Sequence, residues 1–145
     1  MTTATFTDLL RKPKEVLARI DEEQVRITRR DGDDLVILRG ADLDALSMGI
    51  ALSSQLLRAI GRHSGDSVAA VKELFAWTSE FSDDELAEYA REIESLLYSA
   101  SELGHFEKLL RVQSEWRETA VAYAMGMSPI AEVIVGENAE PIGRP

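Results

Sequence analysis

The chain of 145 residues contains no cysteine, which excludes disulfide bonds, thiolate metal ligands and thiol nucleophiles. No apolar run approaches the roughly 20 residues that a membrane-spanning helix needs. The first eight residues lack the basic start and apolar core of a signal peptide, so we expect none. These absences predict a cytoplasmic protein that has no membrane partner.

Catalytic motifs are also missing. The sequence contains no P-loop, no Gly-x-Gly-x-x-Gly and no Gly-x-Ser-x-Gly. Its two histidines, His63 and His105, each lie near a glycine at a predicted helix boundary, where histidine is usually a turn or cap residue. Glu85, Glu88 and Glu92 have helical spacing but lack the Glu-x-x-His pair of ferritin-like metal sites, which favours a solvated acidic face. We therefore predict no catalytic residue, no metal, no cofactor and no enzymatic activity.

The net charge of −10 is unevenly distributed. Residues 1–45 carry eight basic and ten acidic side chains, a net charge of −2, and residues 46–145 carry eight and sixteen, a net charge of −8. Within residues 9–30, seven basic side chains outnumber four acidic ones. The basic front part could contact nucleic acid. The acidic back part suits a basic partner protein, although a solvated helix surface would show the same composition.

The strongest β signal covers residues 24–38. Val25 and Ile27 alternate with Arg26 and Thr28, and an apolar run follows the Asp-Gly pair at residues 31–32, which tolerates positive φ. This pattern predicts a β-hairpin. Before it we expect a short strand over residues 3–7 and a helix from Asp8, capped by the Thr7 hydroxyl and with Pro13 in an early turn. The apolar side of that helix would be formed by Leu9, Val16, Leu17 and Ile20.

The remainder of the chain has helical periodicity. Residues 41–60 predict a helix whose regularly spaced apolar residues are Leu43, Leu46, Ile50, Leu57 and Ile60. After a linker at residues 61–65, we expect helices over 67–77, from a capping box at 82–85 to a stop at Gly104, and over 105–124. The fold class is therefore α+β, with a small domain at 1–62, a helical region at 66–127 and a flexible tail at 128–145.

Aromatic residues of the helical region are candidates for binding a partner, because aromatic side chains concentrate interface energy. We favour the core for Phe75 and Phe106. The polar neighbours of Trp116 leave its role open. The predicted partner-binding residues are Trp77, Trp116 and Tyr123.

Residues 3–50 resemble the N-terminal domain of the Phd/YefM (prevent-host-death) antitoxins. The likeness rests on residues 6–9 at the start of the first helix, 25–30 (Val-Arg-Ile-Thr-Arg-Arg) in the second strand, 33–38 in the third strand and 41–46 in the second helix. The resemblance implies a small fold that dimerises through its sheet and first helices and represses its own operon by binding operator DNA. It also implies a separate C-terminal part that wraps a cognate toxin.

Two features depart from the family pattern. The family usually has Ser-Glu-Ala-Arg at the start of its first helix, whereas residues 7–10 are Thr-Asp-Leu-Leu, so Leu10 takes the place of a DNA-contacting arginine. The C-terminal part of the family is commonly short, but here about 80 residues have helical patterns. Basic residues close to Leu10 could replace its missing contact. The predicted DNA-binding residues are Arg11, Lys12, Lys14, Arg29 and Arg30.

Three hypotheses follow. The first is a homodimeric antitoxin that represses its own operon and binds a toxin, for which family habit and the acidic back part favour a basic ribonuclease of the RelE/ParE type, with PIN-domain and Doc-like toxins as rivals. The second is a protein-binding module of the same fold that does not bind DNA. The third is a small enzyme that uses scattered carboxylates.

Overall fold

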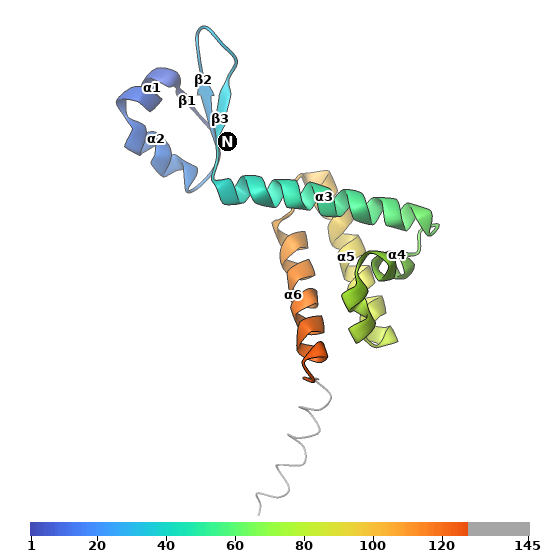
Figure 1. Cartoon of the computed structure of the whole chain (residues 1–145). Coiled ribbons are helices and arrows are strands. Elements are labelled where there is room, and N and C mark those ends of the chain that lie inside the picture. Colours follow the sequence, from blue (N-terminus) through green and yellow to red (C-terminus); the bar gives the residue numbers. More distant parts are fainter. Residues whose placement is uncertain (128–145) are drawn as a thin grey trace, which may run out of the picture. The chain divides into compact units, whose positions relative to one another are not determined.

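A computed structural model describes residues 1–127, which form a mixed α+β structure with a three-stranded sheet (Figure 1). The contacts divide the chain into two compact units, Met1–Ser47 (unit 1) and Met48–Pro145 (unit 2). The elements, in chain order, are β1 (Thr2–Thr5), α1 (Phe6–Arg11), α2 (Pro13–Ile20), β2 (Val25–Thr28), β3 (Leu35–Ile37), α3 (Gly40–Arg62), α4 (Ser67–Leu74), the 3-10 helix η1 (Ala76–Glu80), α5 (Asp83–Leu103) and α6 (Glu107–Ala124).

The sheet of unit 1 has the order β1-β2-β3. β1 runs parallel to β2, which requires a crossover connection, and α1 and α2 supply it. β2 and β3 form the predicted hairpin, with Val25 opposite Ile37 and Ile27 opposite Leu35. Val25 and Ile27 are fully buried, and Arg26 between them is exposed. The alternation in the sequence therefore identified the buried face of the central strand correctly.

The connection between β2 and β3 is longer than a tight turn. It comprises the six residues 29–34, and Gly32 does not adopt a positive φ. A Cβ at Gly32 would lie 2.9 Å from Nη2 of Arg29, so the end of this flexible side chain would have to shift. The Arg29 Nε–H group donates a 2.8 Å hydrogen bond to the Asp33 carbonyl, which holds the side chain over the loop.

The helical crossover differs from the sequence prediction in its first cap. Thr5, and not Thr7, is the N-cap of α1: its hydroxyl accepts from the Asp8 N–H at 3.0 Å, and the Asp8 carboxylate accepts from the Thr5 N–H at 3.1 Å. The chain breaks at Lys12, and Pro13 starts α2, where its missing N–H group costs no hydrogen bond.

The buried face of α3 also differs from the prediction. Its buried residues are Gly49, Ser53, Leu56, Ala59 and Ile60. Of the predicted apolar residues only Ile60 is buried, whereas Leu43, Leu46, Ile50 and Leu57 are between 38% and 51% exposed. Leu17 of α2, predicted on the apolar side, is likewise exposed. Helical spacing identified an apolar stripe in each helix but could not tell which stripe a neighbouring element covers.

Unit 2 is helical, and its helix ends follow the sequence signals. Asp66 caps α4, Ser82 and Glu85 form the predicted capping box of α5, and Gly104 ends α5 with a φ of 72°. Phe106 is buried as predicted, whereas Phe75 is partly buried. The largest fully buried side chains of this core are Leu56, Val71, Tyr89, Ile93, Leu97 and Leu109.

The division of the chain falls at residues 47 and 48, inside α3, and differs from the boundary expected at residues 62–66. The glycine-rich stretch at residues 61–65 is partly helical, since α3 continues to Arg62, and only a short connection to α4 follows.

The expected tail at 128–145 lies outside the described residues. None of the helices found in residues 1–127 combines the length and apolar character that a membrane crossing demands.

Candidate functional site

The five basic residues predicted to bind DNA are all exposed in unit 1. They fall into two groups. Arg29 and Arg30 follow β2, and Arg11, Lys12 and Lys14 surround the break between α1 and α2. The parallel pairing of Thr5 with Thr28 brings the beginning of α1 beside the first group. The second group lies at the other end of α1, about 8 Å away along the helix.

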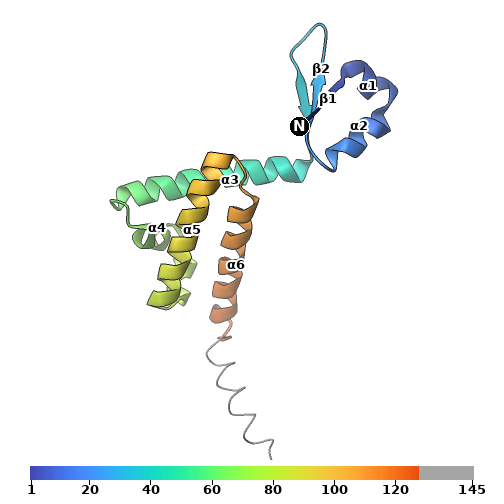
Figure 2. The ribbon, with the colours of Figure 1, turned by 180° about the vertical axis from the view of Figure 1, so that it is seen from behind.

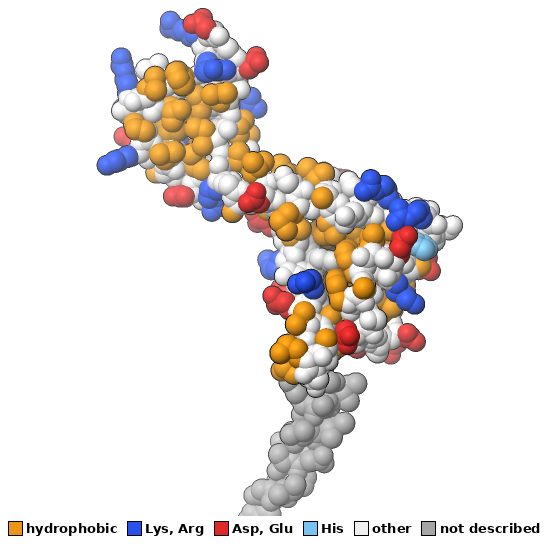
Figure 3. Space-filling model, viewed as in Figure 1, with side chains coloured by type: hydrophobic (Ala, Val, Ile, Leu, Met, Phe, Trp, Pro, Cys, Tyr) orange, Lys and Arg blue, Asp and Glu red, His pale blue; other side chains and the backbone are white. Residues whose placement is uncertain are grey.

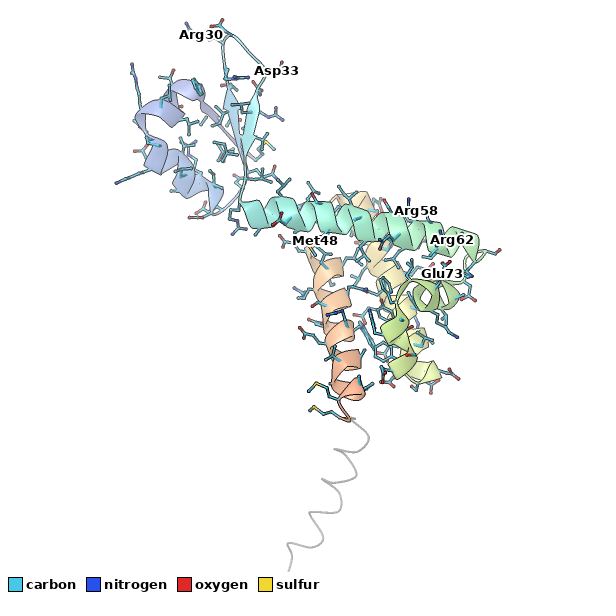
Figure 4. All side chains as sticks on the ribbon, in the orientation of Figure 1. Arg30, Asp33, Met48, Arg58, Arg62 and Glu73 are labelled. Carbon is cyan, nitrogen blue, oxygen red and sulfur yellow. The ribbon has the colours of Figure 1, made fainter. Side chains whose placement is uncertain are left out.

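Arg29 and Arg30 flank an open hollow. It is lined by Thr5, Phe6, Thr7, Thr28, Arg29, Arg30 and Asp31. Arg30 lies in the loop at the far end of the hairpin from α3 (Figure 4) and forms no hydrogen bond or ion pair with any residue from 1 to 127. The lining combines threonine hydroxyl groups with guanidinium groups, and phosphate oxygens accept hydrogen bonds from both.

Unit 1 has a large exposed apolar surface that the sequence analysis did not predict. Leu10, which takes the place of the family's arginine, is 66% exposed. Hydrophobic side chains gather over the region of α1 and α2 in Figure 3. The exposed apolar residues of α1 and α2, here called the unit 1 apolar face, are Phe6, Leu10 and Leu17.

The three predicted partner-binding residues belong to an aromatic cluster of unit 2. Trp116 lies 5.5 Å from Tyr89 and 5.4 Å from Phe81, measured between ring centroids. Tyr123 contacts Phe81 at 6.1 Å, and Trp77 lies 5.3 Å from Tyr89. These rings are partly buried and packed against the core, so they support the fold of unit 2.

Trp116 and Tyr123 also line a hollow between α5 and α6, while Trp77 does not. We call it the acidic hollow, and its volume is about 400 Å³. The Trp116 Nε1–H group donates to Glu92 at 3.1 Å, so the ring orients a carboxylate of the same hollow. The lining residues are Glu85, Glu88, Glu92, Glu115, Trp116, Thr119 and Tyr123. Sequence spacing had placed Glu85, Glu88 and Glu92 on one helix face. Only the pairing of α5 with α6 brings Glu115 and the aromatic rings of Trp116 and Tyr123 beside them.

Hydrogen bonds shift the acid–base equilibria at this hollow. Burial acts to raise the pKa of Glu85, but hydrogen bonds from the Tyr123 hydroxyl and from Ser82 outweigh it and lower the pKa below its ordinary value of 4.5. The same carboxylate raises the pKa of Tyr123 to about 12. Burial raises the pKa of Tyr89, whose hydroxyl donates to Gln113 at 2.6 Å. At neutral pH the hollow therefore presents an ionised Glu85 beside the neutral phenol of Tyr123.

A second hollow lies between the same two helices, next to the turn at Gly104, and we call it the cationic hollow. Its apolar lining includes Leu96, Leu103 and Leu109. Leu103 is 68% exposed. Its charged and titratable lining residues are His105, Glu107, Lys108 and Arg111.

An ion pair connects the end of α3 to α4. The Arg62 guanidinium contacts the Glu73 carboxylate at 2.8 Å (Figure 4), and His63 Nε2 lies 3.4 Å from the same carboxylate. The hydrogen bond from Arg62 lowers the pKa of Glu73. Within residues 1–127 no three His, Asp or Glu side chains are grouped so that they could hold a metal ion.

Comparisons of the chain with family models, curated proteins and solved structures returned no match.

Proposed function

We propose that this chain is the antitoxin of a type II toxin–antitoxin system. In this proposal unit 1 dimerises and binds operator DNA upstream of its own gene, and unit 2 binds the cognate toxin and neutralises it. The observation that carries the proposal is the hairpin of unit 1, which presents Arg29 and Arg30 outward beside the beginning of α1. The sequence resemblance of residues 3–50 to Phd/YefM antitoxins supports the same function.

The small core of unit 1 supports dimerisation. Its buried residues are Ala4, Val16, Ile20, Val25 and Ile27. A unit of this size seldom buries enough apolar surface to be stable alone. Pairing with a second copy would bury the unit 1 apolar face and so add the apolar burial that one copy lacks. A two-fold dimer uses the same surface on both copies.

The exposed arginines suit a DNA backbone. A two-fold dimer would carry two copies of the Arg29 and Arg30 pair, and each cation that meets a phosphate releases a counterion. Arg29 is oriented by its bond to Asp33, while Arg30 has its whole guanidinium free for a phosphate. Such contacts position the protein on DNA, and sequence preference needs further contacts to bases.

The acidic hollow supports the binding of a basic toxin by unit 2. Four carboxylates and two aromatic rings meet there, and a guanidinium or ammonium group is attracted by both kinds of group. The net charge of −8 on residues 46–145 would also speed the encounter with a positively charged partner. A basic ribonuclease of the RelE/ParE type fits this charge best, and PIN-domain and Doc-like toxins are rivals.

A protein-binding module without DNA binding is the second candidate. The observations that favour it are the net charge of −10, which opposes approach to DNA, and the exposed Leu10 where the family has an arginine. In that case unit 2 would still bind its partner protein, and only the binding of DNA by unit 1 would be absent.

A gel-shift experiment with the DNA upstream of the gene separates the two candidates. We expect binding that weakens as salt increases, and the double variant Arg29→Ala/Arg30→Ala should lose at least about tenfold in affinity at moderate salt. Lys72→Ala in α4 removes an exposed charge of unit 2 and is the matched control. Salt-independent binding, or equal binding by the double variant, would contradict the DNA-binding part.

Co-expression with the product of the neighbouring gene tests the antitoxin part. We expect that product to arrest growth alone and to become harmless, and to co-purify, when this chain is present. Glu88→Lys/Glu92→Lys should weaken the protection, because both substitutions reverse charge in the acidic hollow. A neighbouring product that is harmless alone and does not co-purify would refute the proposal.

A further inference from the structure

The acidic and cationic hollows lie on one continuous face of the hairpin of α5 and α6, which run side by side and meet at the Gly104 turn (Figure 2). On α5 the residues that line them recur every three or four positions, which aligns them along the helix: Glu85, Glu88, Glu92, Leu96, Ser99 and Leu103. On α6 the same spacing aligns Lys108, Arg111, Glu115 and Thr119. We call this surface the bipolar face.

The charge of the bipolar face changes sign along its length. The half near the Gly104 turn carries two cations, Lys108 and Arg111, against one carboxylate, Glu107, beside apolar lining residues. The other half carries the four carboxylates of the acidic hollow. These charges are largely available to a ligand. Lys108 and Glu88 form no ion pair within residues 1–127, and Arg111 contacts Glu115 only at 3.8 Å with both side chains more than 60% exposed.

From this pattern we propose that the bipolar faces of two copies of this chain pair in an antiparallel, two-fold manner. The cationic half of each copy then covers the acidic hollow of the other. Because the arrangement is two-fold, the same contact between opposite charges forms twice. The exposed Leu103 of one copy would lie against the Trp116 and Tyr123 rings of the other, which gives the contact an apolar anchor.

The net negative charge of the chain does not prevent this pairing. Glu88 and Leu103 are about 22 Å apart along α5, at 1.5 Å per residue. The screening length is about 8 Å at physiological salt, so the repulsion between the acidic halves is largely screened. The attraction between opposite halves acts at contact distance and is much less weakened.

The size of the bipolar face predicts a weak association. A face about 27 Å long and two helices wide offers about 500 Å² per copy, which is below the roughly 800 Å² of a stable interface. We expect a reversible contact that depends on salt. If the proposed function holds, the second copy covers the acidic hollow until a more basic partner displaces it.

Sedimentation analysis of the full-length chain tests the pairing without any partner protein. The average mass should rise with concentration at about 0.05 M salt and rise less at about 0.5 M salt. The variants Glu88→Lys/Glu92→Lys and Lys108→Glu/Arg111→Glu should each associate at least about tenfold more weakly than the wild type, because like charges then face each other. Mixing the two variants should restore the average mass, because opposite charges meet again.

The mixing step separates this contact from a dimer formed by unit 1, which would be the same in both variants and would not respond to mixing. Glu80→Lys and Lys72→Glu reverse exposed charges outside the bipolar face and should leave the association unchanged. Charge-reversed variants that associate like the wild type, or a mixture that gains no mass, would overturn the pairing. That result would leave the antitoxin proposal standing, because toxin neutralisation is measured separately.

Discussion

The Tyr123 hydroxyl donates a 2.5 Å hydrogen bond to the carboxylate of Glu85, 38 residues earlier in the chain. This contact joins the end of α6 to the beginning of α5 at the acidic hollow. Each partner changes the acid–base equilibrium of the other, since the pKa of Glu85 is lowered and that of Tyr123 is raised. The bond therefore contributes stability that depends on pH.

Tyr123→Phe should lower the free energy of unfolding by about 1 kcal/mol at neutral pH. Because the folded pKa of Glu85 is depressed, the contribution of this carboxylate is present above 4.5 and is lost as the pH falls through the folded value. The contribution of Tyr123 is present below its ordinary pKa of 10.0 and is lost as the pH rises through about 12. Urea unfolding at several pH values should show the variant and the wild type converging in acid.

Tyr98→Phe is the control for this measurement, because its exposed hydroxyl makes only a 3.4 Å contact with Glu94. A loss in Tyr98→Phe equal to that in Tyr123→Phe would show that the partly buried hydrogen bond between Tyr123 and Glu85 has no special effect on stability.

Gly49→Ala should destabilise unit 2 by about 1–3 kcal/mol, the usual cost of overpacking. An added Cβ would lie 2.2 Å from the Cβ of Phe106, so α3 and the beginning of α6 would have to separate. Thermal unfolding followed by circular dichroism measures the loss. Gly61→Ala, in the same helix, has no atom within 4 Å of the added Cβ and should be neutral or stabilising by up to about 1 kcal/mol. Equal effects of the two substitutions would contradict the close helix contact.

Thr5→Ala should destabilise unit 1 by about 1 kcal/mol, because it removes the hydroxyl that caps α1. Thr7→Ala should have little effect, although the sequence had suggested that residue as the cap. The pKa of Asp8 is lowered by its hydrogen bonds with Thr5, so the effect of Thr5→Ala should fade as acid protonates that carboxylate. Chemical unfolding of both variants at neutral and acidic pH gives the comparison. A larger loss in Thr7→Ala would refute the assignment.

Leu10→Ser/Leu17→Ser should convert a unit 1 dimer to monomers without unfolding unit 2, because both side chains are exposed on the unit 1 apolar face. Light scattering after size-exclusion chromatography measures the mass. Leu57→Ser removes a leucine of α3 that is 44% exposed, and it serves as the comparison. If the double variant keeps the mass of the wild type, dimerisation does not use this face.

The sequence alone determined the features that depend on nearest neighbours in the chain. The alternation around Ile27, the capping box at Ser82 and the stop at Gly104 act over one to four residues, and each appears where local patterns predicted it. The α+β class and the approximate bounds of the helices follow from such signals.

Tertiary structure decided which surfaces are covered and which distant side chains meet. Leu56 is buried and its neighbour Leu57 is exposed, because only one side of α3 meets the other helices of unit 2, and periodicity cannot tell which stripe that is. The acidic hollow likewise needs Glu85 beside Tyr123, two residues that only the packing of α5 against α6 brings together. Local sequence preferences therefore determined where the helices and strands form. Burial and long-range contacts determined which face of each helix or strand is covered and which is exposed, and the proposed functions depend on the exposed faces.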